Sequence, residues 1–257
     1  MNALLALWTG LVYLFLYLPI GVIVLFSFSQ GRVLALPIRG WTLDWYRQAL
    51  SDDRLRSGLL TSLEVAAAAT GLALVLGSLG AFALQRYTIP GRPALRTLVV
   101  LPIILPGILT GVAMLSGFAA LDIPLGLTTV IAGHVTIGLP VVLNTVAARV
   151  ARLPQSLEEA AADLGATPWQ TFWQVVFPNL RSALTAGGLL AFTLSFDEII
   201  VTLFLTGEDN TLPMEIWARL RFGMTPAINA TVSLILGFSL ALALISQRLA
   251  LTQPLKD

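Results

Sequence analysis

Residues 156–180 read SLEEAAADLGATPWQTFWQVVFPNL and form the longest polar interval in the second half of an otherwise apolar chain. The pattern predicts two short helices that meet at Gly165. Ser156 and Glu159 have the spacing of a capping box, in which a hydroxyl and a carboxylate satisfy the free N–H groups that start a helix. Gly165 then offers the left-handed conformation that ends a helix without a steric cost. We therefore expect a helical elbow outside the lipid.

The second helix of the elbow has its own start and stop signals. Thr167, Pro168 and Gln170 repeat the capping pattern, because proline suits the first helical position. Apolar side chains then recur at the spacing of one helix face, at Trp169, Phe172, Trp173 and Val176. Pro178 is expected to end this helix, since it lacks the N–H of a helical hydrogen bond.

Composition places the chain in a membrane. Of its 257 residues, 56% are hydrophobic and 11% are charged, with a mean hydropathy of +0.84, against about 25% charged residues in soluble domains. The net charge of +1 supports no nucleic-acid partner. The chain has no cysteine, which excludes disulfides, thiolate catalysis and cysteine-ligated metals.

Six apolar runs are long enough for a hydrocarbon core of roughly 30 Å, which takes about 20 residues. They are residues 3–28, 59–84, 97–121, 127–148, 182–205 and 230–249. The first run is too long for the core of a signal peptide, so we expect it to be retained. The third and fourth are expected to form a hairpin around residues 122–126. The predicted fold class is all-α, a polytopic membrane protein with six transmembrane helices.

The loops between these runs differ in character. Residues 41–50 are amphipathic, and Trp41, Trp45 and Tyr46 suit a membrane interface on the outer side. Residues 86–96 form a short basic loop that we expect in the cytoplasm. Basic residues are nearly balanced between the two sides, so they do not decide the orientation. Residues 101–111, LPIILPGILTG, predict a bent helix that either lines a passage or is kinked only for helix packing.

Polar residues inside the expected spans are candidates for function. Ser195, Asp197 and Glu198 lie in the fifth run, where each ionised carboxylate costs at least about 2.5 kcal/mol. Asp197 lies about 24 Å beyond Arg181 along a helix, toward the outer side. One hypothesis is a path for a cation; the alternatives are pairing with an arginine or a simple helix cap. Glu64 either joins this path or is an interfacial carboxylate.

Other chemistry finds little support. His134 is the only histidine, so a metal site there would need carboxylate ligands and a helix contact is favoured. Lys256 is the only lysine, so the chain cannot hold a phosphate-binding Gly-Lys-Ser/Thr loop. An intramembrane enzyme would have only Asp197 and Glu198 as catalytic material. A stand-alone secondary carrier is a third alternative.

The elbow resembles a known motif. Glu159-Ala160-Ala161, three residues, Gly165, nine residues and Val175-x-Phe177-Pro178 are similar to the EAA loop of MetI-like inner-membrane permease subunits of binding-protein-dependent ABC importers. In that family the loop is a cytoplasmic coupling helix that docks into a cleft on the ATP-hydrolysing subunit. The implied coupling residues are Glu158, Glu159, Ala160, Ala161, Asp163, Gly165, Thr167, Trp169, Phe172, Trp173 and Pro178.

Residues 191–213 and 101–111 resemble the polyamine branch of this family, the second membrane subunit of spermidine/putrescine importers; related permeases carry ferric iron, thiamine or phosphonates. The resemblance implies a non-catalytic subunit without its own cofactor. Its partners would be two ATPase subunits that bind ATP and Mg²⁺, a second permease subunit and a periplasmic solute-binding protein. It also implies a bacterial inner membrane location, with both termini and the 152–180 loop cytoplasmic. We expect a permease domain at 55–247, preceded by a span and loop at 1–54 and followed by a tail at 248–257.

Overall fold

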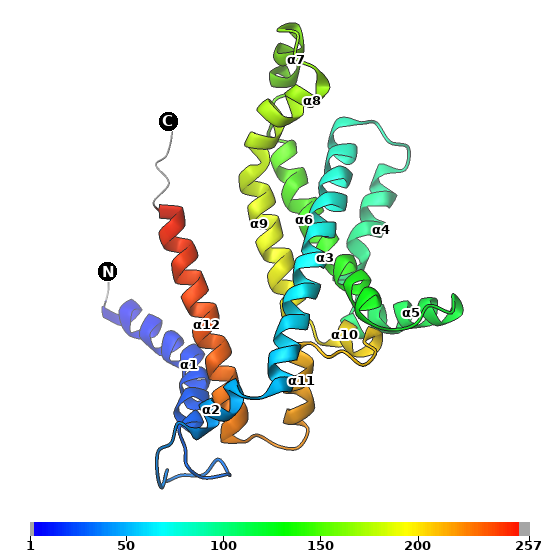
Figure 1. The fold of residues 1–257 in the computed structure, drawn as a ribbon. Coiled ribbons are helices and arrows are strands. Elements are labelled where there is room, and N and C mark those ends of the chain that lie inside the picture. Colours follow the sequence, from blue (N-terminus) through cyan, green and yellow to red (C-terminus); the bar gives the residue numbers. More distant parts are fainter. Residues whose placement is uncertain (1–2, 252–257) are drawn as a thin grey trace. The chain divides into compact units, whose positions relative to one another are not determined.

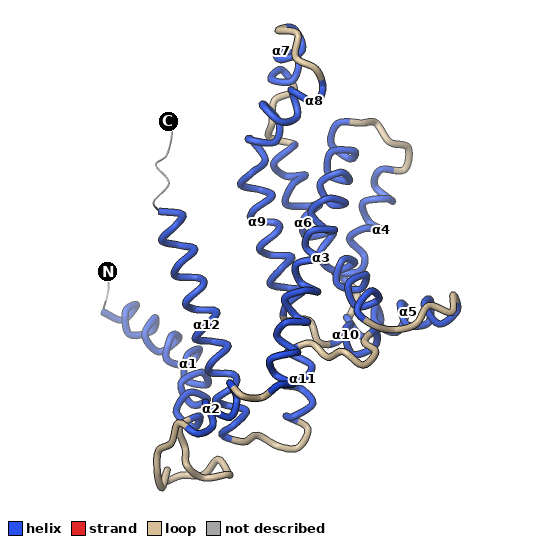
Figure 2. Tube along the Cα trace, in the orientation of Figure 1, coloured by secondary structure: helices blue, strands red, loops and turns tan. Residues whose placement is uncertain are grey.

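The computed structural model describes residues 3–251, whose helices form two compact units (Figures 1 and 2). Of the described residues, unit 1 contains 3–56 and 215–251, and unit 2 contains 57–214. Apart from one bridge between Ser29 and Trp41, the regular structure in this part of the chain is helical. The all-α class is thus confirmed. Lys256 and the end of the expected tail lie outside the described residues.

Unit 1 joins the first and last helices of the chain. Helix α1 is Ala3–Ser27, α2 is Asp44–Leu50 and α12 is Pro226–Leu251, and α12 contacts both of the others. Two of the aromatic residues expected at the membrane interface fasten α2 to the end of α1. The indole of Trp45 donates to the Ser29 carbonyl at 2.8 Å, and the Tyr46 hydroxyl lies 2.5 Å from that of Ser27.

One ion pair joins two segments of unit 1 that are far apart in the sequence. Arg219 donates to both carboxylate oxygens of Asp52, at 2.8 and 3.0 Å. The Arg219 guanidinium therefore lowers the pKa of the Asp52 carboxyl from its usual value. Asp52 also accepts hydrogen bonds from the backbone N–H groups of Arg54 and Leu55, so the same carboxylate caps the start of the following helix.

Unit 2 is built around three long helices. They are α3, Asp53–Arg86, whose first turn belongs to unit 1; α6, Leu127–Val150; and α9, Phe177–Phe196. Their buried core consists largely of small and β-branched side chains, namely Ala73, Ala81, Leu84, Val142, Leu143, Val146, Ala147, Val150, Leu153, Val176, Leu180 and Ala191. Small residues let membrane helices approach closely. Close van der Waals packing then holds the helices together, because in lipid there is no hydrophobic driving force between them.

The third expected run is broken rather than straight. Helix α4, Arg92–Ile104, and helix α5, Gly107–Ala120, are bent by 109°. Leu105 is extended, with ψ of 144°, because a residue before proline avoids the helical conformation, and Pro106 has no N–H to continue the helix. The predicted bend is confirmed. The predicted hairpin is wrong, because α5 turns sideways from α4 and α6 (Figure 1).

The fifth expected run is also interrupted. Helix α9 ends at Phe196, and the short helix α10, Ile200–Leu205, follows after three residues. The prediction of one continuous span over 182–205 is therefore wrong, because the backbone at residues 197–199 is not helical. Helix α11 is Leu212–Leu220.

Length and apolar composition identify four candidate spans in the described chain. They are Leu4–Ser27, Asp53–Arg86, Leu127–Val150 and Pro168–Phe196. Counting the bent pair of α4 and α5 as one span raises the number to five. The chain is thus a polytopic helical membrane protein.

The close approach of α3 to α6 generates a test of the core. A Cβ at Gly77 would lie 2.9 Å from Val142 Cγ1 and 3.1 Å from the Leu143 nitrogen. We expect Gly77→Ala to lower the free energy of unfolding by about 1–3 kcal/mol through overpacking. The measurement is thermal or denaturant unfolding of the purified subunit in detergent.

Gly71→Ala is the matched control on the same helix, because a Cβ there meets nothing within 4 Å. It should be neutral or slightly stabilising, since alanine favours a helix over glycine. Equal destabilisation by the two variants would contradict the packing described for Gly77.

Candidate functional site

The elbow of unit 2 has the predicted turn at Gly165. Helix α7 is Ser156–Asp163, and Gly165 has a φ of +83°. The N–H of Gly165 donates to the Ala162 carbonyl at 2.8 Å, and that of Ala166 donates to the Ala161 carbonyl at 3.0 Å. This pair of bonds is the Schellman motif that closes a helix. The sequence prediction for the turn is confirmed.

The predicted capping box at Ser156 is wrong. Gln155 is already helical, and its carbonyl accepts from the N–H groups of Glu158 and Glu159 at 2.9 and 3.1 Å. No side chain caps this end, because the chain enters the helix from residues that are themselves in helical conformation. Glu159 is therefore not folded back on the backbone, and it is exposed.

The second capping box forms as predicted. The Thr167 N–H donates to the Gln170 side-chain oxygen at 2.8 Å, and the Gln170 N–H donates to the Thr167 hydroxyl at 3.3 Å. The helix that follows is α8, Pro168–Thr171.

Pro178 does not end the second helix, contrary to the prediction. A π-helical turn, Phe172–Val176, joins α8 to α9, and the helix continues unbroken from Pro168 to Phe196. The wider turn relieves the clash between a proline ring and the preceding turn. The Asn179 side chain also donates to the Val175 carbonyl at 2.8 Å, which satisfies one acceptor near the proline.

The aromatic stripe of the elbow divides between the core and the surface. Val176 is buried, and Phe172 packs against the core with its ring 6.5 Å from that of Phe82. Trp169 and Trp173 remain 70% and 44% exposed, with their rings 5.5 Å apart. The sequence pattern did not separate these two roles, because the spacing identifies a helix face but not which of its side chains contact the core.

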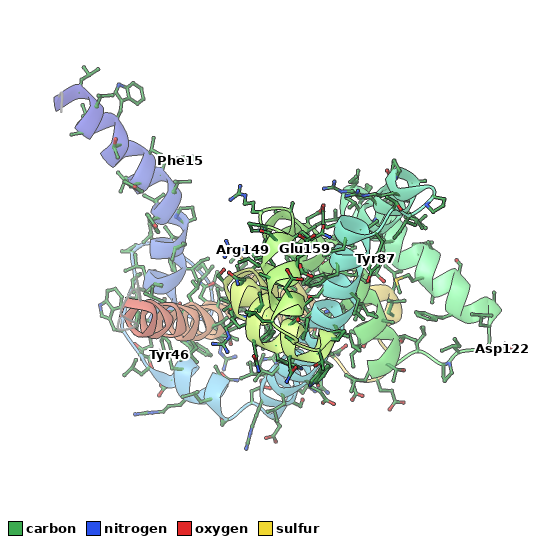
Figure 3. The ribbon with its side chains drawn as sticks, turned by 90° about the horizontal axis from the view of Figure 1, so that it is seen from above. Phe15, Tyr46, Tyr87, Asp122, Arg149 and Glu159 are labelled. Atoms are coloured by element: carbon green, nitrogen blue, oxygen red, sulfur yellow. The ribbon has the colours of Figure 1, made fainter. Side chains whose placement is uncertain are left out.

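An exposed surface results at the tip of unit 2, which we call the elbow surface. It consists of Glu159, Ala160, Asp163, Leu164, Trp169 and Trp173. Leu164 is 90% exposed. Figure 3 views this end along the bundle, with Glu159 and Arg149 labelled. Ala161, Thr167 and Pro178 lie in the same elbow, Ala161 being half-buried.

Glu158 faces its own chain instead of joining the elbow surface. Its carboxylate lies 2.5 Å from Arg86 Nη2 at the end of α3, and both side chains are largely shielded. The same nitrogen donates to the Leu153 carbonyl at 3.2 Å. Arg86 therefore fastens α7 to the helical bundle. Sequence reasoning missed this partner, because 72 positions separate the two residues.

The acidic residues lie at the break between α9 and α10. Asp197 is exposed, whereas the half-buried Glu198 accepts from the Val201 N–H at 2.9 Å and so caps α10. Among the side chains that the structure describes, those of residues 3–237 and 240, neither carboxylate makes an ion pair. The helix-cap alternative thus holds for Glu198, and no arginine pairing is observed. Glu64 is exposed on α3, about 33 Å along the helix from Arg86.

Ser195 and His134 are buried beside this break. The imidazole lies 2.7 Å from the Ser195 hydroxyl and 2.8 Å from that of Thr202. The predicted role of His134 as a helix contact is confirmed. Among the described residues no group of three histidine, cysteine or acidic side chains could hold a metal ion.

Comparison with known proteins assigns these features to a family. Residues 73–251 match the family described as "Binding-protein-dependent transport system inner membrane component". The putrescine transport system permease protein PotI of Escherichia coli K12 is 35% identical over 233 residues, which are 88% of this chain and 83% of PotI. The spermidine/putrescine permease protein PotC of Haemophilus influenzae is 33% identical over 92% of each chain.

Other relatives widen the range of transported solutes. The sulfate transport system permease protein CysT of Escherichia coli K12 is 32% identical, over 83% of this chain and 82% of CysT. In fold, a bacterial ABC transporter involved in import of the acidic polysaccharide alginate matches with a TM-score of 0.70 at 19% identity, covering 98% of this chain and 95% of that chain. The elbow, the helical bundle and these matches together show that the chain belongs to the inner-membrane permease components of binding-protein-dependent ABC importers.

Proposed function

We propose that this permease imports a polyamine, and that its elbow couples the transport path to ATP hydrolysis on partner subunits. The observation that carries the proposal is the unbroken helix Pro168–Phe196, which starts in the elbow and ends at Asp197. At 1.5 Å per residue it is roughly 43 Å long. A movement of the elbow would therefore be carried along one rigid element to the acidic break.

The elbow surface suits docking to an ATPase subunit. Leu164, Trp169 and Trp173 present apolar area that no other described part of the chain covers, and exposed apolar patches of this kind mark interaction sites. A short helix with such anchors fits a groove on a partner. Gly165 and the Schellman bonds around it hold the two helices of the elbow at a defined angle, so that force applied to α7 reaches α8.

The assembly that we propose has two ATPase subunits, which bind ATP and Mg²⁺, a second permease subunit and a periplasmic solute-binding protein. The 152–180 loop and both termini would be cytoplasmic. The chain would cross the membrane six times if the bent pair of α4 and α5 counts once and α12 adds a span. Residues 55–247 would then form the permease domain, and ATP-driven closure would switch the path between inward-open and outward-open states.

The acidic break favours a cationic solute. Asp197 is exposed and has no ion-pair partner among the side chains of residues 3–237 and 240, and Glu198 is next to it. Carboxylates in a partly desolvated path attract an ammonium group and repel an anion such as the sulfate of CysT's system. Ser195 and Glu64 belong to the same proposed path. Together with the similarity to PotI and PotC, this supports putrescine or spermidine over ferric iron, thiamine or phosphonate.

The turn at Gly165 provides the first test of coupling. Gly165→Val places a β-branched residue at a φ of +83°, which costs roughly 1–3 kcal/mol of strain or distorts the elbow. We expect ATP hydrolysis by the reconstituted complex to persist while polyamine uptake falls about tenfold or more. Gly91→Val is the matched control, because Gly91 has a φ of +72° in the loop before α4. Wild-type coupling in Gly165→Val would contradict the docking role.

The ion pair between Arg86 and Glu158 provides a second test. Arg86→Glu and Glu158→Arg should each reduce uptake per ATP hydrolysed, because a hydrogen-bonded charge pair contributes about 1.5–3 kcal/mol. The double exchange should recover part of the loss; recovery is incomplete because a basic residue suits the end of α3. Arg92→Glu controls for charge alone, since Arg92 lies nearby and is exposed. A double variant that couples uptake to ATP hydrolysis no better than either single variant would refute the role of this ion pair in coupling.

Removing the two negative charges at the break tests whether the transported solute is a cation. Asp197→Asn combined with Glu198→Gln removes both charges, while glutamine can still accept from the Val201 N–H and keep the cap. Uptake of spermidine or putrescine should fall at least tenfold, with assembly unchanged by copurification. Normal uptake in an intact complex would exclude the cation path. Calorimetric binding of polyamines to the partner solute-binding protein would test the solute independently.

A further inference from the structure

His134 spans the break in the fifth run. Its ring lies on α6, Nδ1 contacts the Ser195 hydroxyl before the break at 2.7 Å, and Nε2 contacts the Thr202 hydroxyl after it at 2.8 Å. The histidine is only 2% exposed. One side chain thus bonds both of the helices that flank residues 197–199.

The hydrogen-bond roles around the ring follow from the neighbours. The Thr202 hydroxyl donates its single proton to the Glu198 carbonyl at 3.0 Å, so it can only accept from His134 Nε2–H. A neutral imidazole then has a free acceptor at Nδ1, which receives the Ser195 hydroxyl proton. Both ring nitrogens are satisfied, and the chain of bonds runs from His134 through Thr202 to Glu198.

Helix α10 is held tightly against α6 on both sides of this chain of bonds. A Cβ at Gly133 would lie 2.6 Å from Leu205 Cδ1 and 2.8 Å from Val201 Cγ1, so a larger residue there would require these side chains to shift. The Thr129 hydroxyl lies 2.8 Å from the Leu205 carbonyl. Helix α10 also packs on α5, where a Cβ at Gly111 would lie 2.5 Å from Phe204 Cδ2. The position of α10, and with it that of the break, is therefore fixed by α5 and α6 together.

We propose that His134 is a positioning residue of the substrate path, which fixes the backbone at Glu198 and so the direction of the Glu198 carboxylate at the break between α9 and α10. The ligand of this acidic pair is an organic ammonium group. His134 does not contact the ligand; it acts through Ser195 and Thr202. This inference rests on the proposed cation path, and it adds the residue that fixes the backbone of the break on which the two acids lie.

A single-cysteine reporter measures the arrangement without relying on transport. The chain has no cysteine of its own, so Asp197→Cys introduces its only thiol at the exposed position of the break. In the assembled complex, the rates of modification by a cationic and by a neutral methanethiosulfonate reagent are compared. The ratio of the two rates reports how close the Glu198 carboxylate is to position 197, whereas a general change in access alters both rates alike.

The native His134 background should show a high cationic-to-neutral ratio, and Glu198→Gln in the same reporter defines its floor. His134→Leu removes both bonds, and Thr202→Val removes the link to Glu198 while keeping the side-chain shape. In both we expect the ratio to fall about fivefold or to the floor, since one lost hydrogen bond shifts an equilibrium roughly fivefold. His134→Gln, which offers a donor and an acceptor, should fall less.

Thr136→Val is the matched control on α6. The Thr136 hydroxyl bonds the Ala132 carbonyl within its own helix, so its loss should leave the ratio unchanged. A native ratio in both His134→Leu and Thr202→Val would overturn the proposal. If His134→Leu does not assemble, Thr202→Val decides alone.

The reporter separates this inference from the proposed function. Normal polyamine uptake by the charge-neutral Asp197→Asn, Glu198→Gln variant would refute the cation path whatever the cysteine ratios. Unchanged ratios would refute the role of His134 even if that double variant abolished uptake.

Discussion

The constraint on which the structure depends is that backbone polar groups in a hydrocarbon core must find partners within the protein. Unit 2 departs from regular helix at 105–106, at 172–176, where the elbow leads into α9, and at 197–199. At the second, the Asn179 side chain serves the Val175 carbonyl. At the third, the Glu198 side chain serves an N–H of α10 and Thr202 serves the Glu198 carbonyl. Side chains thus take over the hydrogen bonds that the helix gives up.

Two of these departures lie at points that matter for the proposed mechanism, one where the elbow joins α9 and one where α9 ends at the acidic residues. The π turn lets one helix pass Pro178, so the second helix of the elbow and α9 form one continuous element, Pro168–Phe196. The break at 197–199 separates α10 from α9, and α10 packs on α5 and on α6, where it meets Gly133 and His134. In the proposed mechanism, movement of the helix Pro168–Phe196 would be concentrated at the acidic residues, because α10 beyond them is held by other helices. Small residues along α3 and α6 keep the rest of the bundle close-packed.

The charges of this sparsely charged chain divide into two kinds. Arg86 and Glu158 neutralise each other where α7 meets α3, and their role is to hold the elbow. Asp197 has no ion-pair partner among the side chains of residues 3–237 and 240, and the proposed function assigns its charge to a solute. PotI and CysT are both similar to this chain over most of its length and are named for solutes of opposite charge, so the architecture that those relatives share does not by itself set the charge of the solute. Local side chains have to do so.

The amino-acid sequence by itself determined the local features of this protein. The apolar runs, the turn at Gly165, the Thr167 capping box and the bend at 101–111 depend on neighbouring residues and on the conformational limits of glycine and proline. The EAA spacing likewise identified the family before any contact was known. Each of these signals lies within a few residues of the structure that it predicts.

Only the tertiary structure decided where helices continue, where they break and which distant residues meet. Pro178 was expected to stop a helix, but a π turn supported by Asn179 carries the helix past it. The fifth run looked continuous, yet the bonds from His134 on α6 flank a break that apolar composition conceals. The partners of Glu158 and His134 lie more than sixty positions away in the chain. Such pairings depend on how the helices pack against one another, and the residues near each partner in the sequence do not specify that packing.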